Sequence, residues 1–289
     1  MKLLAGLGFM AGLIPGLLRG AELQADTLKA WEAYIQSADI RMRARLDGTQ
    51  PFLWADESDT RRRAVRHGEV VVAPVLTRGS VSVPAGLIHH WVGAAFIPDS
   101  TIERLVTVLQ DYNRFKEFYK PVIADSRFLG CSQGAPEFSM TWHRRVLFVN
   151  AAIEGHCQAH HFDVSPRRGY SIAEMTQLRE IEQYGRPEER ALPVDTGHGF
   201  IWRLHDITRY EEREGGVYVE VEAMALTRDI PASFRWLVAP VVKHLSADSL
   251  ETMLRQTRDA VGSAHAGLEA VALCPKEVRA AEAKAVREP

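Results

Sequence analysis

The chain has 289 residues, of which 46% are hydrophobic and 25% are charged. This balance is typical of a globular protein of one or two domains and excludes a wholly disordered chain. The formal net charge of −2 provides no overall positive field, so the composition gives no support to binding of nucleic acid.

The N-terminus has the features of a secretory signal. Lys2 is followed by an uncharged, mostly apolar run from Leu3 to Leu18. The run is shorter than the roughly 20 residues of a membrane-spanning helix, and Gly12 and Pro15 interrupt it. We therefore expect residues 1–21 to be a signal peptide of an exported protein, periplasmic or secreted. An uncleaved N-terminal membrane anchor is the alternative.

Residues 22–84 are expected to form a helical and irregular extension. An amphipathic helix should end at Gly48, and a short strand is expected from Glu69 to Ala73. An arginine run between them is interpreted as a solvated face, and attraction to anionic lipid headgroups is the alternative, so peripheral membrane contact stays open. The apolar stripe of the helix consists of Leu23, Leu28, Trp31, Ile35 and Met42. The arginine run consists of Arg61, Arg62, Arg63 and Arg66.

From Leu87 the pattern becomes regular. A strand is followed by a helix in which Ser100 is expected to be the cap, with Glu103 three positions on as in a capping box. The remaining segments favour strands, because apolar and polar side chains alternate with a period of two. The segments from Leu87 onward are residues 87–97 (strand), 98–115 (helix), and 122–130, 137–164, 199–212 and 216–227 (strands). Residues 170–184 could form a strand or a helix, and the flanking segments favour the strand.

The last two strands are expected to form a hairpin around Glu214, Gly215 and Gly216. The second of them has a charged side, with Glu220 and Glu222, that we expect to face water. Its other side changes from valine to alanine. Interiors are closely packed, so small inward residues indicate either a tightly docked helix or room for a ligand. The two sides are Tyr218, Glu220 and Glu222, and Val217, Val219, Val221, Ala223 and Ala225.

The segment from Asp229 to Val261 is apolar but does not span a membrane, because its longest uncharged run, from Trp236 to Val242, is too short. Two consecutive helices are expected here, the second amphipathic from Leu250 onward. The order of elements predicts an α+β fold in which a curved antiparallel sheet grips a long C-terminal helix.

Two segments resemble the START-like helix-grip superfamily, which includes polyketide cyclase-like and coenzyme Q-binding proteins. Residues 96–125 resemble its opening strand, helix and aromatic, proline-punctuated turn, and residues 229–261 look like its closing helix. The resemblance covers about residues 85–265, leaving residues 266–289 as a tail. The turn residues are Asp111, Tyr112, Phe115, Phe118, Tyr119 and Pro121.

The resemblance implies an internal cavity that binds or transports a hydrophobic or amphipathic small molecule, such as a lipid or quinone. Large apolar and small inward residues are its candidate lining, although core packing is the favoured interpretation of any single large one. The candidate ligand-binding residues are Met140, Trp142, Trp202, Val221, Ala223, Trp236, Leu237, Val241, Leu250, Met253, Leu254 and Thr257. Arg144, Arg203 and His205 are the polar candidates near these strands.

No catalytic motif of the family can be carried over, so no catalytic residue is assigned. On a strand, His156 and His160 share one face and Cys157 and His161 the other, so they cannot converge as a closed zinc site requires. No metal and no cofactor are therefore expected. Three cysteines are too few for a disulfide scaffold. Buried free thiols are favoured, and a bridge between Cys131 and Cys157 is the alternative.

Two other functions stay open. A cavity enzyme of the cyclase, dehydratase or hydrolase type would need a titratable group inside the cavity, and His143, His205 and Asp206 are the positions to inspect. An envelope interaction module without a cavity would pack Ala223 and Ala225 tightly against the closing helix. The sequence does not fix the oligomeric state.

Overall fold

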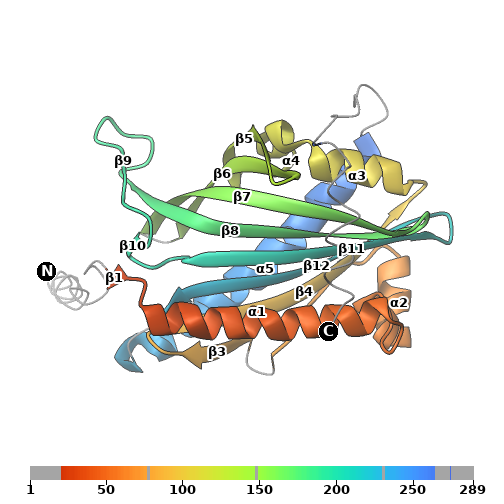
Figure 1. Cartoon of the computed structure of the whole chain (residues 1–289), viewed down its shortest axis with the longest axis horizontal. Coiled ribbons are helices and arrows are strands. Elements are labelled where there is room, and N and C mark those ends of the chain that lie inside the picture. The colour runs from red at the N-terminus through yellow and green to blue at the C-terminus, as the bar shows by residue number, and fades with distance from the viewer. Residues whose placement is uncertain (1–20, 77–78, 147–148, 230–231, 264–273, 275–289) are drawn as a thin grey trace, which may run out of the picture.

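The alternating segments form one large antiparallel sheet (Figure 1). Its strands follow the order β2-β4-β12-β11-β8-β7-β6-β5, with β3 also paired to β4. The structure is a computed structural model that describes residues 21–76, 79–146, 149–229, 232–263 and 274. Side chains are described for these residues except 145–150 and 232–246. Residues 1–20 of the expected signal peptide and most of the expected tail lie outside the described residues.

The elements in chain order are β1 (Ala21–Glu22), α1 (Ala25–Leu46), η1 (Trp54–Glu57), α2 (Asp59–Arg66), β2 (Val71–Pro74), β3 (Ser80–Val83), β4 (Gly86–Pro98), α3 (Ile102–Gln110), η2 (Tyr112–Arg114), α4 (Phe115–Phe118), β5 (Ile123–Ser132), β6 (Ala135–Val146), β7 (Val149–Ser165), β8 (Arg168–Glu182), β9 (Arg190–Ala191), β10 (Thr196–Gly197), β11 (Arg203–Arg213), β12 (Gly216–Arg228) and α5 (Ala232–Ser263).

The hairpin between β11 and β12 confirms the expected turn. The strands pair in unbroken register from Arg213 opposite Gly216 to Arg203 opposite Leu226. Glu214 and Gly215 both have positive φ angles, of 55° and 77°. Two consecutive residues in this region are typical of the tight turn whose twist matches that of antiparallel strands.

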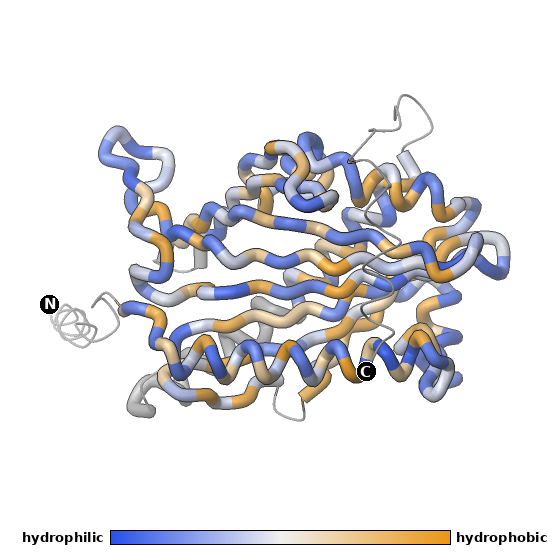
Figure 2. The backbone as a smooth tube through the Cα atoms, in the orientation of Figure 1, coloured by the Kyte–Doolittle hydropathy of each residue, from blue (hydrophilic) through white to orange (hydrophobic). Residues whose placement is uncertain are grey.

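Helices cover the two faces of the sheet (Figure 1). Helix α5 lies against the inner face, where Leu250 and Leu254 pack with Trp91 and Val219. Helix α1 lies on the opposite, outer face and packs on β4, β11 and β12. Hydrophobic and hydrophilic residues are interspersed along the strands and along α1 (Figure 2). This is the helix-grip architecture expected from the sequence, with an additional outer layer.

Two local expectations are corrected. The closing segment is one helix, α5, rather than two, and it continues through Pro240. Helix α3 begins one residue later than expected, so Thr101 and not Ser100 is its N-cap residue.

The largest correction concerns the charged side of β12, which does not face water. Glu220 is 0% exposed and Glu222 is 6% exposed, because the N-terminal extension covers them. Arg209 of β11, which is 1% exposed, lies between the two carboxylates. Its Nη1 donates to Glu222 Oε2 at 2.7 Å, and its Nε lies 3.4 Å from Glu220 Oε2.

The extension supplies the remaining partners of these carboxylates. Glu220 accepts hydrogen bonds from the backbone N–H groups of Trp54 and Ala55, at 2.8 and 2.6 Å. Glu222 Oε1 lies 2.9 Å from His90 Nε2, and His90 Nδ1 lies 2.8 Å from the Tyr34 hydroxyl of α1. Burial alone would raise the pKa of Glu222, but the bonds from His90 and Arg209 hold that pKa well below its usual range.

Residues 22–84 are thus not a separate appendage. Strands β2 and β3 pair with β4 inside the main sheet, so the expected boundary at residue 84 falls within one sheet. The arginine run is also engaged by the chain itself. Arg61 donates to the Trp54 carbonyl and lies 3.7 Å from its ring centroid, and Arg66 pairs with Glu214 at 3.2 Å.

A disulfide joins Cys131 of β5 to Cys274, beyond the end of α5. Cys157 is a buried free thiol. The expected alternatives, a Cys131–Cys157 bridge or three free thiols, are both wrong. The partner of Cys131 lies 143 residues away along the chain, where no strand pattern pointed to it.

Replacing Arg209 by Met should destabilise the protein strongly. It would remove the buried cation that lies between Glu220 and Glu222 and leave only the more distant Arg41, 3.9 Å from Glu222, a change that costs about 3–5 kcal/mol. Arg255→Met is the matched control, because Arg255 pairs with Glu251 on the exposed side of α5 and should lose about 0.5 kcal/mol or less. Urea unfolding of both variants measures the difference. Equal, small losses would contradict a structural role for the buried network.

Reduction should destabilise the fold, because the bridge closes a loop of 143 residues. The expected loss for Cys131→Ser is about 2–5 kcal/mol. Non-reducing peptide mapping should recover the 131–274 linkage in the wild type and in the control Cys157→Ala. A linkage through Cys157 instead would contradict the structure.

Candidate functional site

The inner face of the sheet is closed at one end by α5. A Cβ atom added to Gly93 of β4 would lie 2.7 Å from Leu254 Cδ1 and 3.2 Å from Leu250 Cγ. Real Cβ atoms do not approach other atoms so closely, so the second half of α5 sits directly on β4 at this glycine. At this end the helix fills the space over the sheet.

The inner face remains accessible at the other end of β11 and β12. Ala223, Ala225 and Thr227 point inward and keep part of their surface accessible, while the alternating outward residues Met224 and Leu226 are fully buried. Inward-facing positions on β11 behave in the same way, with partial accessibility at Leu204, Asp206 and Thr208. The small inward side chains of β12 therefore do not all correspond to a tightly docked helix.

Asp206 is the acidic group on this part of the inner face. It stands opposite Ala223 on one side and Ala173 on the other, and Ala173 stands opposite Ala159. The row across β7, β8, β11 and β12 thus contains three alanines and one carboxylate. No side chain of this row is long enough to cover the carboxyl group.

The apolar surroundings raise the pKa of the Asp206 carboxyl to about 6, an effect that the neighbouring His205 partly opposes. The Asp206 side chain nevertheless keeps part of its surface accessible. Burial, and to a smaller extent the charge of Asp206, raise the pKa of the nearby Cys157 thiol. Cys157 is therefore protonated and unreactive as a nucleophile.

Other polar groups of the inner side are satisfied by the protein. His89 lies 3.0 Å from the Thr227 hydroxyl, and burial lowers its pKa to about 4, so it is neutral at physiological pH. The Tyr119 hydroxyl of the turn after α4 lies 3.2 Å from the Thr257 hydroxyl of α5. These pairs fix the walls of the site.

The expected lining residues fall into three groups. Val221, Ala223, Leu250, Met253 and Leu254 pack together under α5. Met140 and Trp142 belong to the adjoining cluster around β5–β8, which Met253 also touches. A Cβ on Gly155 would lie 2.8 Å from the Trp142 ring, so this glycine makes room for the indole. Thr257 is bound to Tyr119, and the side chains of Trp236, Leu237 and Val241 lie outside the described residues.

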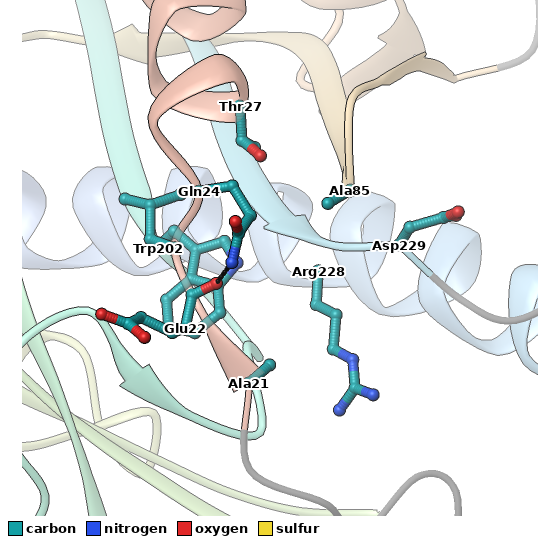
Figure 3. A pocket seen from close by; sticks show the side chains of 9 residues that line it. Ala21, Glu22, Gln24, Thr27, Ala85, Trp202, Arg228 and Asp229 are labelled. Atoms are coloured by element: carbon teal, nitrogen blue, oxygen red, sulfur yellow. Dashed lines mark hydrogen bonds between the residues drawn. The ribbon is translucent and has the colours of Figure 1, made fainter.

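Trp202 lies apart from the other candidates, because it packs in the outer cluster beneath α1. It also lines an open pocket beside the start of α1 (Figure 3), whose rim carries the charged Glu22, Arg228 and Asp229. The pocket shares no other residue with the expected lining. It is lined by Ala21, Glu22, Leu23, Gln24, Thr27, Ala85, Trp202, Arg228 and Asp229.

Most of the polar candidates do not lie on the inner face. Arg203 and His205 point to the outer side, where Arg203 pairs with Asp195 and His205 Nδ1 lies 3.2 Å from Glu174. The His143 ring stacks at a tilt against Tyr184, and Arg144 is half-buried at the far end of β6. Of the three positions singled out for an enzyme, Asp206 faces the interior.

Sequence reasoning missed two hydroxyls beside Asp206. Thr208 follows Asp206 by two residues on the same face, and Ser171 of β8 stands directly opposite Thr208. The period-two alternation of β11 could have identified Thr208. Ser171 needed the pairing register of β8, which no pattern in the sequence specifies.

Within the parts of the chain that the structure describes, no group of three or more His, Cys, Asp or Glu side chains is arranged to hold a metal ion. The helices among these residues include none that is long and apolar enough to cross a membrane.

No family model matches the chain, and no curated protein matches it in sequence. Among solved structures, it is similar to a STAR-related lipid transfer protein from Xanthomonas axonopodis, with 16% identity over 67% of this chain and 98% of that one, and a TM-score of 0.42. The Zhui aromatase/cyclase from Streptomyces sp. R1128 has 10% identity over 61% and 94% of the two chains, with a TM-score of 0.41.

A START superfamily protein from Mycobacterium smegmatis has 9% identity over 61% of this chain and 97% of its own, with a TM-score of 0.39. At such identities and TM-scores these likenesses carry no argument about function. The helix-grip fold is assigned from the strand order and from the position of α5.

Stability should depend on pH through Asp206. Its pKa is higher in the folded protein than the ordinary 3.8, so the proton stabilises the fold. That contribution is complete below about pH 4 and is lost as the pH rises through about 6. The variant Asp206→Asn has no proton to lose at this position. Its free energy of unfolding, relative to that of the wild type, should therefore rise between pH 4 and pH 8 by on the order of 1–3 kcal/mol.

Urea unfolding at several pH values measures this difference. The control is Asp163→Asn, because Asp163 is exposed on β7 and its replacement should give a flat difference. A flat profile for both variants would show that Asp206 is solvated like a surface carboxylate.

Proposed function

We propose that this protein binds a hydrophobic or amphipathic small molecule, of the lipid or quinone type, between the inner face of the sheet and α5. The observation that carries the proposal is the accessibility of the inward positions on β11 and β12. Ala223, Ala225 and Thr227 keep accessible surface on the side that a closed core would bury completely.

The chemistry of the surrounding side chains supports this function. Ligand sites in proteins are mostly apolar, with a few polar groups that orient the ligand. Here Met140, Trp142 and Val221 provide apolar surface, and Asp206 provides a polar group. The interaction module without a cavity is less well supported, because α5 touches the sheet closely at Gly93 but leaves Ala225 accessible.

The alternative of a cavity enzyme depends on Asp206. A carboxyl group with a pKa of about 6 could give or take a proton near neutral pH. Cys157 is protonated and His89 is neutral and bound to Thr227, so neither supplies an activated nucleophile. A carrier returns its ligand unchanged and an enzyme does not, so the mass of a recovered ligand separates the two functions.

An oxidising compartment suits the protein. The Cys131–Cys274 bridge is of a kind that persists outside the cytosol, where thiols are not kept reduced. The signal-like residues 1–21 support the same location. We therefore place the proposed binding function in the periplasm or outside the cell.

A bulky side chain at position 223 should abolish binding. Ala223→Trp would fill the space beside Asp206, so native mass spectrometry with organic extraction should detect a co-purifying lipid or quinone in the wild type but not in the variant. The matched control is Ala33→Trp, because Ala33 is exposed on α1 and its replacement should leave the ligand bound. Loss of ligand in both variants, or binding by neither wild type nor variant to a lipid and quinone panel, would contradict a carrier.

A further inference from the structure

We propose that Asp206, Thr208 and Ser171 form a recognition strip that selects a neutral, hydroxyl-bearing amphiphile and rejects an anionic one. The inference rests on the proposed binding function and narrows its ligand class. It starts from the position of these three side chains on adjacent strands of the inner face.

The strip is compact because of the strand register. Thr208 follows Asp206 by two residues on β11, so both side chains point to the same face. Ser171 on β8 is the direct partner of Thr208, about 4.5–5.5 Å away at the level of Cβ atoms. One carboxylate and two hydroxyls are therefore within reach of a single small head group.

The described part of the chain does not satisfy these groups. Among the described residues, Asp206, Thr208 and Ser171 have no side-chain hydrogen bond, although the histidines nearby are paired. His205 is bound to Glu174 on the opposite face, and His161 to the hydroxyl of Tyr112. The flanking residues of the Asp206 row, Ala173 and Ala223, have no polar atom to offer.

A polar group in apolar surroundings costs free energy unless it is hydrogen-bonded. The ligand head group must therefore supply the missing partners, and an ionised Asp206 can only accept. A hydroxyl can donate to Asp206 and also accept from Thr208 or Ser171. A fatty carboxylate would place a second negative charge beside Asp206, with no cation on the described inner-face strip to offset it.

An ammonium head group could also donate to Asp206. It would, however, have to lose the hydration of a full charge, and a buried ion pair often does not recover that cost. The neutral hydroxyl avoids this penalty. We therefore assign the strip to alcohols rather than amines, and the choice between them is open to direct test.

The test uses three probes with the same twelve-carbon chain and different heads: dodecan-1-ol, dodecylamine and dodecanoate. Their Kd values are measured at pH 8 by displacement of an uncharged fluorescent apolar dye. The wild type should bind dodecanol at least about tenfold more tightly than dodecanoate, which corresponds to about 1.4 kcal/mol. Asp206→Asn, which removes the charge, should reduce this ratio to about threefold or less, mainly by tighter binding of dodecanoate.

The control Asp163→Asn removes an exposed carboxylate of the same strand layer and should keep the wild-type ratio. Equal or tighter binding of dodecanoate by the wild type would overturn the inference, as would an unchanged ratio in Asp206→Asn. A strong preference for dodecylamine would assign the strip to cations instead. If the dye and all three probes fail to bind, the proposed binding function itself fails, whereas binding without the expected preference contradicts only the selectivity for hydroxyl groups.

Discussion

The buried charge network on the outer face constrains the rest of the structure. Glu220 and Glu222 stand on a central strand and cannot be left dry without partners, because an unpaired buried charge is costly. Arg209 pairs with both from the next strand, and the backbone N–H groups of Trp54 and Ala55 donate the further hydrogen bonds that Glu220 accepts. These hydrogen bonds fix where the N-terminal extension, including α1, packs on the outer face of the sheet.

Because this outer layer stabilises the central strands, the inner face does not have to be completely filled. The central strands are held from outside by α1, η1 and the network, so they do not depend on a filled interior along their whole length. Helix α5 can then close the inner face at Gly93 and leave it accessible beyond Ala223. Asp206 lies in this second region, where its carboxyl stays desolvated but not covered.

Much of the fold follows from the sequence, because period-two alternation assigns side chains to faces and the closing amphipathic helix needs an apolar surface. Alternation does not say what covers each face. Glu220 and Glu222 have the pattern of a solvated side, and their partners Trp54, Ala55 and His90 lie more than a hundred residues earlier. Alternation places His205 and Asp206 on opposite faces of β11 but does not say which of them points inward. The isolation of the Asp206 carboxyl group could not be predicted either, because it depends on alanines from three other strands.

The Cys131–Cys274 bond has a topological consequence for α5. It makes residues 131–274 a closed covalent ring that contains β6 to β12 and the whole helix. Helix α5 is thus connected covalently to the sheet at both of its ends, through the chain to β12 and through the disulfide to β5. In the sheet, β11, β8, β7 and β6 lie between these two strands. Reduction would leave α5 joined covalently only to β12, and the helix would then be held on the sheet by non-covalent packing such as that of Leu250 and Leu254.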